Sequence, residues 1–222
     1  GPYDVARLNQ GEFLNDTIVN FYLKFFLEKH PELKERVHLF NTFFYEKLQV
    51  PNEYGKVSNF EKVRKWTTKA NLFSRDFIII PIHMKMHWYV TIVYNLPALL
   101  KPKPENSENS SSTEGSSTRS LRSRDRVIKK RGNVDFNPET DCYIFICDSL
   151  QGSRYDTLVK NLKAYFVAEA KDKLDQTIDP SRIISRSVSV PQQTNYSDCG
   201  VYLIHFVQCF FDDPDKFAKL MS

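Results

Sequence analysis

Few of the residues that mark the simplest sequence classes are present. The chain of 222 residues has only 7 glycines and 4 cysteines, and no Cys-x-x-Cys pair. This cysteine pattern argues against a disulfide scaffold or a closed zinc site and favours a reducing compartment. No Gly-x-Gly-x-x-Gly or P-loop pattern marks a nucleotide site. No apolar run reaches about 18 residues, and the first ten residues lack the apolar stretch of a signal peptide, so we expect no membrane span.

Aromatic residues, by contrast, are plentiful. The 17 Phe and 11 Tyr are enough to build a core, which excludes a fully disordered chain. The length fits one globular domain, so we expect residues 1–222 to form a single domain that carries one large insertion.

The expected insertion, residues 99–137, differs in composition from the sequence around it. It is rich in Ser, has almost no aromatic residues and ends in a basic run. Such a composition buries too little apolar area to offset its ordering entropy, which predicts a flexible surface segment. Residues 101–133 hold 9 of the 31 basic and 4 of the 27 acidic residues, which leaves 22 basic and 23 acidic residues elsewhere. The net charge of +4 therefore belongs to the insertion, and we do not expect the core to bind nucleic acid.

Apolar periodicity predicts helices around a strand-rich centre. Asn15 or Asp16 is the expected N-cap of the first helix. The last helix is apolar almost all round, which is typical of a buried helix, and we expect Trp66 and the Phe-rich helices to lie in the core. Helical spacing is found in residues 13–26, 38–48, 59–68, 155–175 and 200–211, buried-strand character in 77–80, 87–94 and 142–147, and edge-strand alternation in 183–190. This order predicts an α+β fold with helices flanking a central sheet.

Three polar residues stand at the ends of these elements. His87 opens strand 87–94, Asp148 follows strand 142–147, and Cys199 precedes helix 200–211. A cysteine protease needs a thiolate, a base that forms it and a group that orients the base. Backbone N–H groups at a helix N-terminus stabilise a thiolate, and the amide of Gln193 could add an oxyanion donor. Spacing alone is weak evidence, since a lone Cys on an apolar helix is usually a small buried hydrophobe.

The sequence around these residues resembles the Ulp/SENP family of SUMO proteases. Residues 191–206 (PQQTNYSDCGVYLIHF) are similar to the family's nucleophile segment, 87–89 (HWY) to its histidine segment and 147–149 (CDS) to its aspartate segment. Residues 12–16 (EFLND) and 40–45 (FNTFFY) resemble two further segments, and all five occur in the family's order. The resemblance implies a papain-like superfamily fold of Ulp/SENP type, with a central mixed sheet. The order His, Asp, Cys differs from papain itself, whose Cys comes first.

The resemblance also implies a role for each matching residue. Cys199 would attack the carbonyl of a C-terminal Gly-Gly, and His87 would take the thiol proton and return it to the leaving amine. Asp148 would hold the His87 tautomer, and Gln193 would bind the oxyanion. Trp88 would cover the di-glycine tail, where a flat indole leaves no room for a Cβ atom.

Two further residues would contact the substrate. Phe13 stands where commoner members have Trp, and it could equally be a core residue. Asp16 matches an aspartate that pairs with a basic residue of SUMO. Phe at this position and the long gap between His87 and Asp148 resemble the branch that edits SUMO chains. The implied protein is a nuclear, monomeric SUMO isopeptidase without cofactor or metal, whose partners are SUMO conjugates and poly-SUMO chains. Family members continue past the last helix, so we expect the chain to be truncated there.

Several alternatives stay open. The chain could act on another ubiquitin-like modifier, be an adenain-like endopeptidase, bind SUMO without catalysis, or bind nucleic acid through its insertion. His83 and His87 have spacing that could bind zinc, but no third ligand is close and His-Glu-x-x-His is absent. Cys142, Cys147 and Cys209 lie on apolar elements and are expected to be inert. Cys142 and Cys147 should face opposite sides of one strand and therefore not pair.

Overall fold

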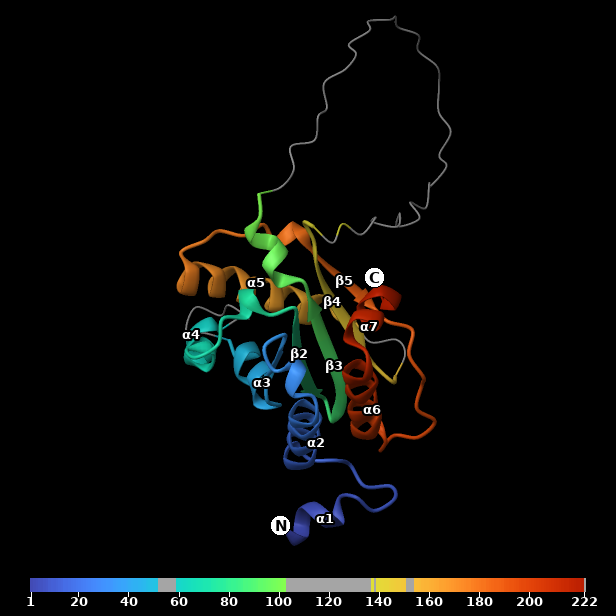
Figure 1. The fold of residues 1–222 in the computed structure, drawn as a ribbon. Helices are drawn as coiled ribbons and strands as arrows, with labels where there is room; N and C mark the ends of the chain where they lie inside the picture. Colours follow the sequence, from blue (N-terminus) through green and yellow to red (C-terminus); the bar gives the residue numbers. More distant parts are fainter. Residues whose placement is uncertain (52–58, 103–136, 138, 151–153, 222) are drawn as a thin grey trace, which may run out of the picture.

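The computed structural model describes residues 1–51, 59–102, 137, 139–150 and 154–221. Most of the predicted insertion lies outside these residues, so its flexibility stays a prediction. Figure 1 shows the described chain as one sheet with helices on both sides.

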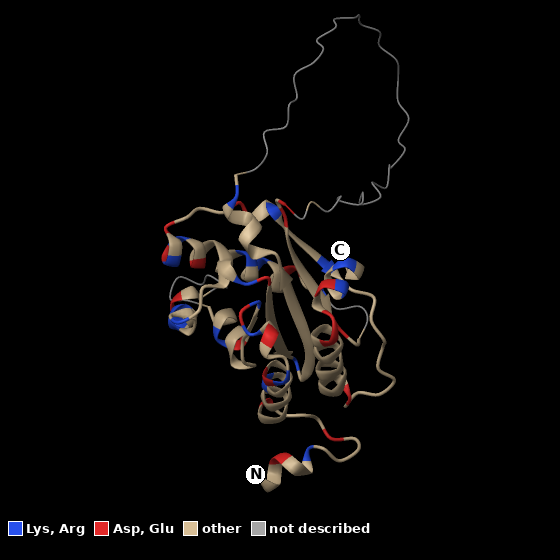
Figure 2. Ribbon diagram, viewed as in Figure 1, with Lys and Arg blue, Asp and Glu red and all other residues tan. Residues whose placement is uncertain are grey.

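A five-stranded mixed sheet forms the centre of the fold. Its strands lie in chain order, and β3 is antiparallel to its neighbours β2 and β4. The edge strands β1 and β5 run parallel to β2 and β4, respectively. The strands are β1 (Val37–Leu39), β2 (Phe77–Met84), β3 (His87–Tyr94), β4 (Cys142–Cys147) and β5 (Ile183–Ser187). The three central strands contain no Lys, Arg, Asp or Glu and are rich in β-branched and aromatic residues, as expected for strands buried on both faces. Figure 2 shows that the charged residues lie mainly on the surrounding helices and loops.

The described residues also form seven α-helices and five 3-10 turns, which loops connect. The helices are α1 (Pro2–Ala6), α2 (Asp16–Lys29), α3 (Phe43–Gln49), α4 (Phe60–Val63), α5 (Asp156–Leu174), α6 (Cys199–Asp212) and α7 (Pro214–Met221). The 3-10 turns are η1 (Pro31–Leu33), η2 (Arg64–Thr67), η3 (Leu72–Ser74), η4 (Leu96–Leu100) and η5 (Pro180–Arg182). The result is the predicted α+β fold with a mixed sheet flanked by helices.

The sheet separates two apolar cores. Helices α3, α4 and α5 pack on one face, and α2, α6 and α7 pack on the other (Figure 1). Tyr165 and Phe166 fill the first core, and Phe145 and Phe210 fill the second, all with 0% exposure. Burying one such side chain contributes about 1.5–3 kcal/mol, so the two cores hold the strand ends firmly in place.

Two predicted helices form differently. The expectation of one helix over residues 38–48 is wrong, because His38 and Leu39 lie in β1 and α3 begins only at Phe43. His38 pairs with Ile78 in the parallel β1–β2 ladder, so long-range strand pairing overrides the local helical spacing. The stretch predicted over 59–68 forms the short helix α4 followed by the 3-10 turn η2.

Three elements that were expected to be buried have exposed positions instead. Trp66 is 36% exposed, and Phe21 on α2 is 62% exposed. Helix α6 is not buried all round, since Val201 is 52% exposed and Cys209 is also at the surface. The physical reason is common to all three: each helix lies outside the sheet and buries only the side that faces it.

Arg182 fixes the end of the sheet that flanks residues 103–136. The side chain is buried, and its guanidinium donates hydrogen bonds of 2.8 Å to the carbonyl oxygens of Ala98, Lys101 and Thr140. These carbonyls belong to the chain on both sides of the segment, so one side chain holds the two stems together. No helix in the described ranges is both long and apolar enough to cross a membrane.

Candidate active site

The sheet brings His87, Asp148 and Cys199 to one place. His87 is the first residue of β3, and Asp148 follows the last residue of β4; because the two strands are antiparallel, both side chains lie at the same end of the sheet. Cys199 is the first residue of α6, which packs against β3. His87 Nε2 lies 2.6 Å from Asp148 Oδ1.

His87 is held in a charged hydrogen-bonded chain. Since Nε2 faces Asp148, Nδ1 is the ring nitrogen left for the Cys199 thiol. Burial alone would lower the pKa of His87, but its hydrogen bonds with Asp148 and Cys199 outweigh burial and raise the pKa to about 9. The ring therefore keeps a proton at neutral pH and stabilises a thiolate beside it.

Asp148 is fixed by three donors. Besides His87, the backbone N–H of Leu150 donates to Oδ1 at 2.8 Å and the hydroxyl of Tyr155 donates to Oδ2 at 2.5 Å. The residue is 7% exposed, so these bonds replace the water that a free carboxylate would bind. The carboxylate thus has one fixed position from which it can orient the His87 ring.

The segment that precedes α6 is tied to the end of β4. The backbone N–H of Gln193 donates to the Ser149 carbonyl at 2.9 Å, and the Ser149 hydroxyl donates to Gln193 Oε1 at 2.6 Å. Gln193 Nε2 donates one hydrogen to the Asn195 carbonyl at 2.7 Å, which leaves its second hydrogen for another acceptor. The Gln192 amide adds a bond of 3.1 Å to the Asp148 carbonyl. The predicted oxyanion donor is therefore anchored beside Asp148.

Trp88 joins the N-terminal segment to the sheet. The indole is 1% exposed, its Nε1 donates to the Leu14 carbonyl at 2.9 Å, and its ring stacks on His83 with centroids 4.2 Å apart. Leu14 also packs on the start of α6, where a Cβ added to Gly200 would come within 2.9 Å of Leu14 Cβ. This close approach explains why a glycine follows Cys199.

Phe13 and Asp16 lie on either side of Leu14 in the sequence. Phe13 is half-buried and packs against the core under α6, while Asp16 is the first residue of α2. Asn15 is the N-cap, as predicted, since its Oδ1 accepts a 3.1 Å hydrogen bond from the Ile18 N–H. Both candidate substrate residues thus lie within two positions of Leu14, whose carbonyl accepts the Trp88 hydrogen bond.

The remaining candidates lie apart from this chemistry. Cys142 and Cys147 are fully buried in opposite cores, as their spacing predicts, and burial raises the pKa of Cys147 to about 12. Cys209 Sγ lies 3.6 Å from His205 Nε2 on the surface of α6. Among the described residues, no group of three His, Cys, Asp or Glu side chains could hold a metal ion.

Sequence reasoning missed four parts of the site. Ser149 and Gln192 adjoin residues that were identified, and that adjacency was the available signal. The Leu14 carbonyl is a backbone acceptor, which side-chain patterns do not reveal. Tyr155 opens the stretch of helical spacing over residues 155–175, and nothing in the local sequence indicates that its hydroxyl reaches Asp148.

Comparisons with known proteins place the chain in a protease family. Residues 12–218 match the family described as "Ulp1 protease family, C-terminal catalytic domain". The chain is 36% identical to ubiquitin-like-specific protease 2 of Schizosaccharomyces pombe, covering 96% of this chain and 33% of that protein. It is 31% identical to human sentrin-specific protease 7, covering 95% of this chain and 23% of that protein. The chain thus spans a third or less of the length of these curated relatives.

Solved structures show the same fold. A crystal structure of a de-sumoylating protease superposes with a TM-score of 0.74 at 26% identity, covering 99% of this chain and 70% of that one. The C-terminal Ulp1 protease domain in complex with Smt3, the yeast orthologue of SUMO, superposes with a TM-score of 0.56 at 23% identity, covering 95% of this chain and 71% of that one. At that identity the second likeness shows the fold alone.

Proposed function

The chain belongs to the Ulp1 protease family, and we propose that it is a SUMO-specific cysteine isopeptidase that cleaves after a C-terminal Gly-Gly. The observation that carries the proposal is the pairing of His87 with Asp148 at 2.6 Å, at the end of the sheet where Cys199 begins α6. A histidine that is held by a carboxylate and lies beside a cysteine can take the thiol proton, which is what a cysteine nucleophile requires.

The reaction we propose follows from these positions. The Cys199 thiolate attacks the carbonyl carbon of the terminal glycine, and the bond from that carbon to the lysine nitrogen breaks as His87 donates its proton to the amine. A thioester on Cys199 remains. His87 then takes a proton from water, the resulting hydroxide attacks the thioester, and the thiolate is released with a free glycine carboxylate. Asp148 keeps the ring aligned through both steps.

The oxyanion of each tetrahedral intermediate needs donors. We assign this role to the uncommitted N–H of Gln193 and to backbone N–H groups at the start of α6, where the helix dipole also favours negative charge. The Ser149 bonds fix the Gln193 amide before the substrate arrives, so no reorganisation is needed.

Burial at the site supports a glycine tail as the substrate. Cys199 and Trp88 are each 1% exposed, which leaves little width for an approaching chain. A residue without a Cβ atom fits such an approach best. We assign Trp88 to cover this tail, with Phe13 on the same side, and Asp16 to a surface ion pair that would orient SUMO more than it would tighten binding.

Chain editing is the finer part of the proposal. Phe13 and the long segment between His87 and Asp148 resemble the branch that dismantles poly-SUMO chains, and two of the matched relatives are a ubiquitin-like-specific protease 2 and a sentrin-specific protease 7. The test compares cleavage of mono-SUMO conjugates with cleavage of SUMO chains. Equal rates per linkage would remove the chain preference and leave the isopeptidase assignment intact.

We also propose a nuclear location, which rests on the same family resemblance. Imaging of the tagged protein would check it.

The nucleophile is tested by Cys199→Ser. The variant should lose cleavage of SUMO conjugates while it still binds SUMO, because the hydroxyl is far less nucleophilic than the thiolate. Cys209→Ser is the matched control: the same atom changes at an exposed position on the same helix, and turnover should stay normal. Near-normal turnover by Cys199→Ser would refute the assignment.

The alternatives differ in simple measurements. If only a ubiquitin probe labelled the protein, its substrate would be another modifier than SUMO. If Cys199 did not react with iodoacetamide, a non-catalytic SUMO-binding module would be favoured. Deleting residues 101–133 should remove any nucleic-acid binding without affecting cleavage. Strong DNA binding by the deleted form would assign that activity to the core.

A further inference from the structure

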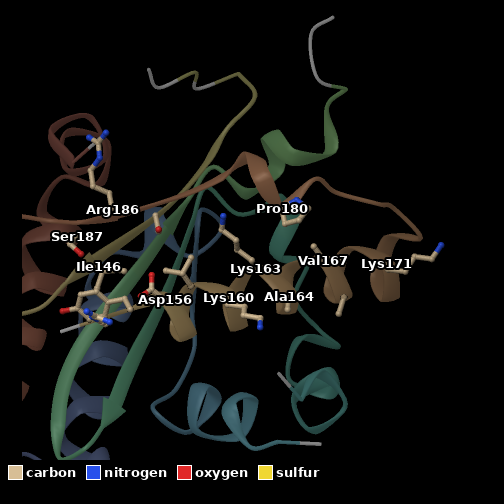
Figure 3. A pocket seen from close by; sticks show the side chains of 15 residues that line it. Ile146, Asp156, Lys160, Lys163, Ala164, Val167, Lys171, Pro180, Arg186 and Ser187 are labelled. Carbon is tan, nitrogen blue, oxygen red and sulfur yellow. The ribbon is translucent and has the colours of Figure 1, made fainter. Parts of the chain in front are cut away.

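A large hollow lies between helix α5 and the edge strand β5, and its lining includes Tyr155, whose hydroxyl donates to Asp148. Its volume is about 1240 Å³, and Figure 3 shows the side chains that line it. Arg186 belongs to the lining only through its backbone, since its guanidinium donates to the Met221 carbonyl in α7 at 3.3 Å and the side chain stands beside that helix in Figure 3. We call the remainder, lined by α5 and β5, the α5–β5 groove.

The helix side of the groove combines apolar and basic residues in one stripe. The lining residues of α5 recur every three or four positions: Asp156, Val159, Lys160, Lys163, Ala164, Val167, Ala168 and Lys171. This spacing places them on one side of the helix over about 22 Å. Val159 and Val167 form an apolar floor, half-buried, while Lys160 is exposed beside it. The face thus differs from the opposite side of α5, which packs into the core.

Two of the three lysines of this stripe have no ion-pair partner among the described residues. Within the described ranges, neither Lys160 nor Lys163 forms an ion pair, and Asp156 is the single acidic residue of the lining. Lys171 pairs only with the exposed Asp175. Two unpaired lysines beside an apolar floor favour a ligand that is both acidic and partly apolar.

The strand side of the groove is an unpaired sheet edge. β5 pairs with β4 alone, and the Val188 N–H donates to the Ile146 carbonyl at 2.9 Å, so the even-numbered residues of this strand direct their backbone groups toward β4. The backbone groups of Ser185 and Ser187 then point outward, because they alternate with these residues. In the part of the chain that the structure describes, no hydrogen bond engages them. Their small side chains leave the groove open.

We propose that the α5–β5 groove binds an extended acidic peptide segment of a partner protein, which adds a strand to β5 and sets its carboxylates beside Lys160 and Lys163. The outward N–H and C=O groups of β5 would give the backbone pairing, as in other cases of strand addition, and the lysines would give the charge preference. A 22 Å groove accommodates about seven residues of extended chain. Nucleic acid fits less well, because bases stack on aromatic rings and Tyr155 is the single aromatic residue among the described lining residues. This inference does not rest on the proposed protease activity.

Peptide binding to the intact chain tests the charge requirement. The probe is a fluorescein-labelled decapeptide in which glutamate alternates with valine, measured by fluorescence anisotropy. Lys160→Glu/Lys163→Glu should weaken its binding by about tenfold or more. Lys65→Glu/Lys69→Glu is the matched control, because it makes the same charge change at exposed positions outside the groove and should have little effect. A peptide with lysine in place of glutamate should not bind.

Hydrogen exchange tests the strand pairing. Binding of the glutamate peptide should slow exchange of the Ser185 and Ser187 amides, while the Arg186 amide, which faces β4, should change little. Turnover of a small di-glycine reporter should be unaffected by the groove variant. The proposal is overturned by absence of saturable peptide binding, by equal weakening in both double variants, by protection elsewhere in the chain, or by tighter groove binding of a ten-nucleotide single-stranded DNA.

Discussion

The Tyr155 hydroxyl donates a 2.5 Å hydrogen bond to Asp148 Oδ2, the carboxylate oxygen that does not face His87. Tyr155 directly precedes α5. A residue next to a helix on one face of the sheet therefore fixes the Asp148 carboxylate at the end of the sheet. Asp148 is thereby held from both sides, and its orientation does not depend on His87.

Removing this hydroxyl should change the titration of His87. In Tyr155→Phe, Asp148 loses a donor and becomes a stronger acceptor for the imidazolium, so we expect the pKa of His87 to rise further above its value of about 9. Turnover should fall by about tenfold as the carboxylate loses its fixed position. The pH–rate profile and the histidine ring resonances in NMR measure both effects.

A matched control separates positioning from loss of a buried hydroxyl. The hydroxyl of Tyr45 accepts a hydrogen bond from the Asn161 amide in the same apolar core, far along the chain from the triad. Tyr45→Phe should leave the pH–rate profile in place. If both variants lowered turnover without moving the profile, Tyr155 would have a structural role only.

The raised pKa of His87 has a defined pH window. Because the folded state binds this proton more tightly than the unfolded state, whose value is near 6.5, the contribution to stability is complete below about pH 6.5 and is lost as the pH rises through about 9. Turnover should decline over the same upper range, since the leaving amine needs the His87 proton.

Asp148→Asn tests why the pKa of His87 is raised. Replacing the carboxylate removes the largest effect that raises the pKa of His87, so the pKa should fall and turnover should drop by about 10²–10⁴-fold. NMR titration of the His87 ring measures the first change directly. An unchanged His87 titration in this variant would disprove the assigned cause.

Gly200 tolerates no side chain without movement. Gly200→Ala would place its Cβ 2.9 Å from Leu14 Cβ, an atom fixed to the backbone, so the N-terminal segment must shift. We expect a loss of about 1–3 kcal/mol in the free energy of unfolding, together with reduced turnover, because the Leu14 carbonyl holds Trp88. Denaturant unfolding and steady-state rates measure these effects. Val201→Ala, at the adjacent exposed position, should be nearly neutral in both assays.

Arg182 should contribute to stability but not to catalysis. Arg182→Leu leaves the buried carbonyls of Ala98, Lys101 and Thr140 without this donor, and we expect a loss of about 2–4 kcal/mol in unfolding free energy. Arg64→Leu removes an exposed ion pair with Asp172 and should cost less than about 1 kcal/mol. Urea unfolding compares the two variants. Equal losses, or loss of turnover by folded Arg182→Leu, would contradict this role.

The sequence predicted four of the five strands, and the polar residues at two of their ends, for a physical reason. Strands β3 and β4 are almost entirely apolar. His87 at the start of β3 and Asp148 after the end of β4 therefore stand out as polar residues. The position of Cys199 follows in the same way, because the apolar helix begins there.

What the sequence did not predict depends on partners far along the chain. His38 becomes a strand residue only because β2 is available to pair with it. Trp66 and Phe21 are apolar in type, but their exposure depends on which side of a short helix faces the sheet. The Tyr155 hydroxyl acquires its role by donating to Asp148 at the end of β4. The spacing of apolar residues around Tyr155 does not reveal this contact.

The Arg182 contacts have one further consequence. The two stems they join leave the sheet beside the last residue of β3 and the first residue of β4, at the opposite end from His87 and Asp148. The eight residues of β3 separate the two ends by about 25 Å. Adding or removing sequence between the stems therefore leaves the spacing of the catalytic pair unaltered. A reporter domain or a targeting module could therefore be inserted at this junction without changing the geometry of the catalytic residues.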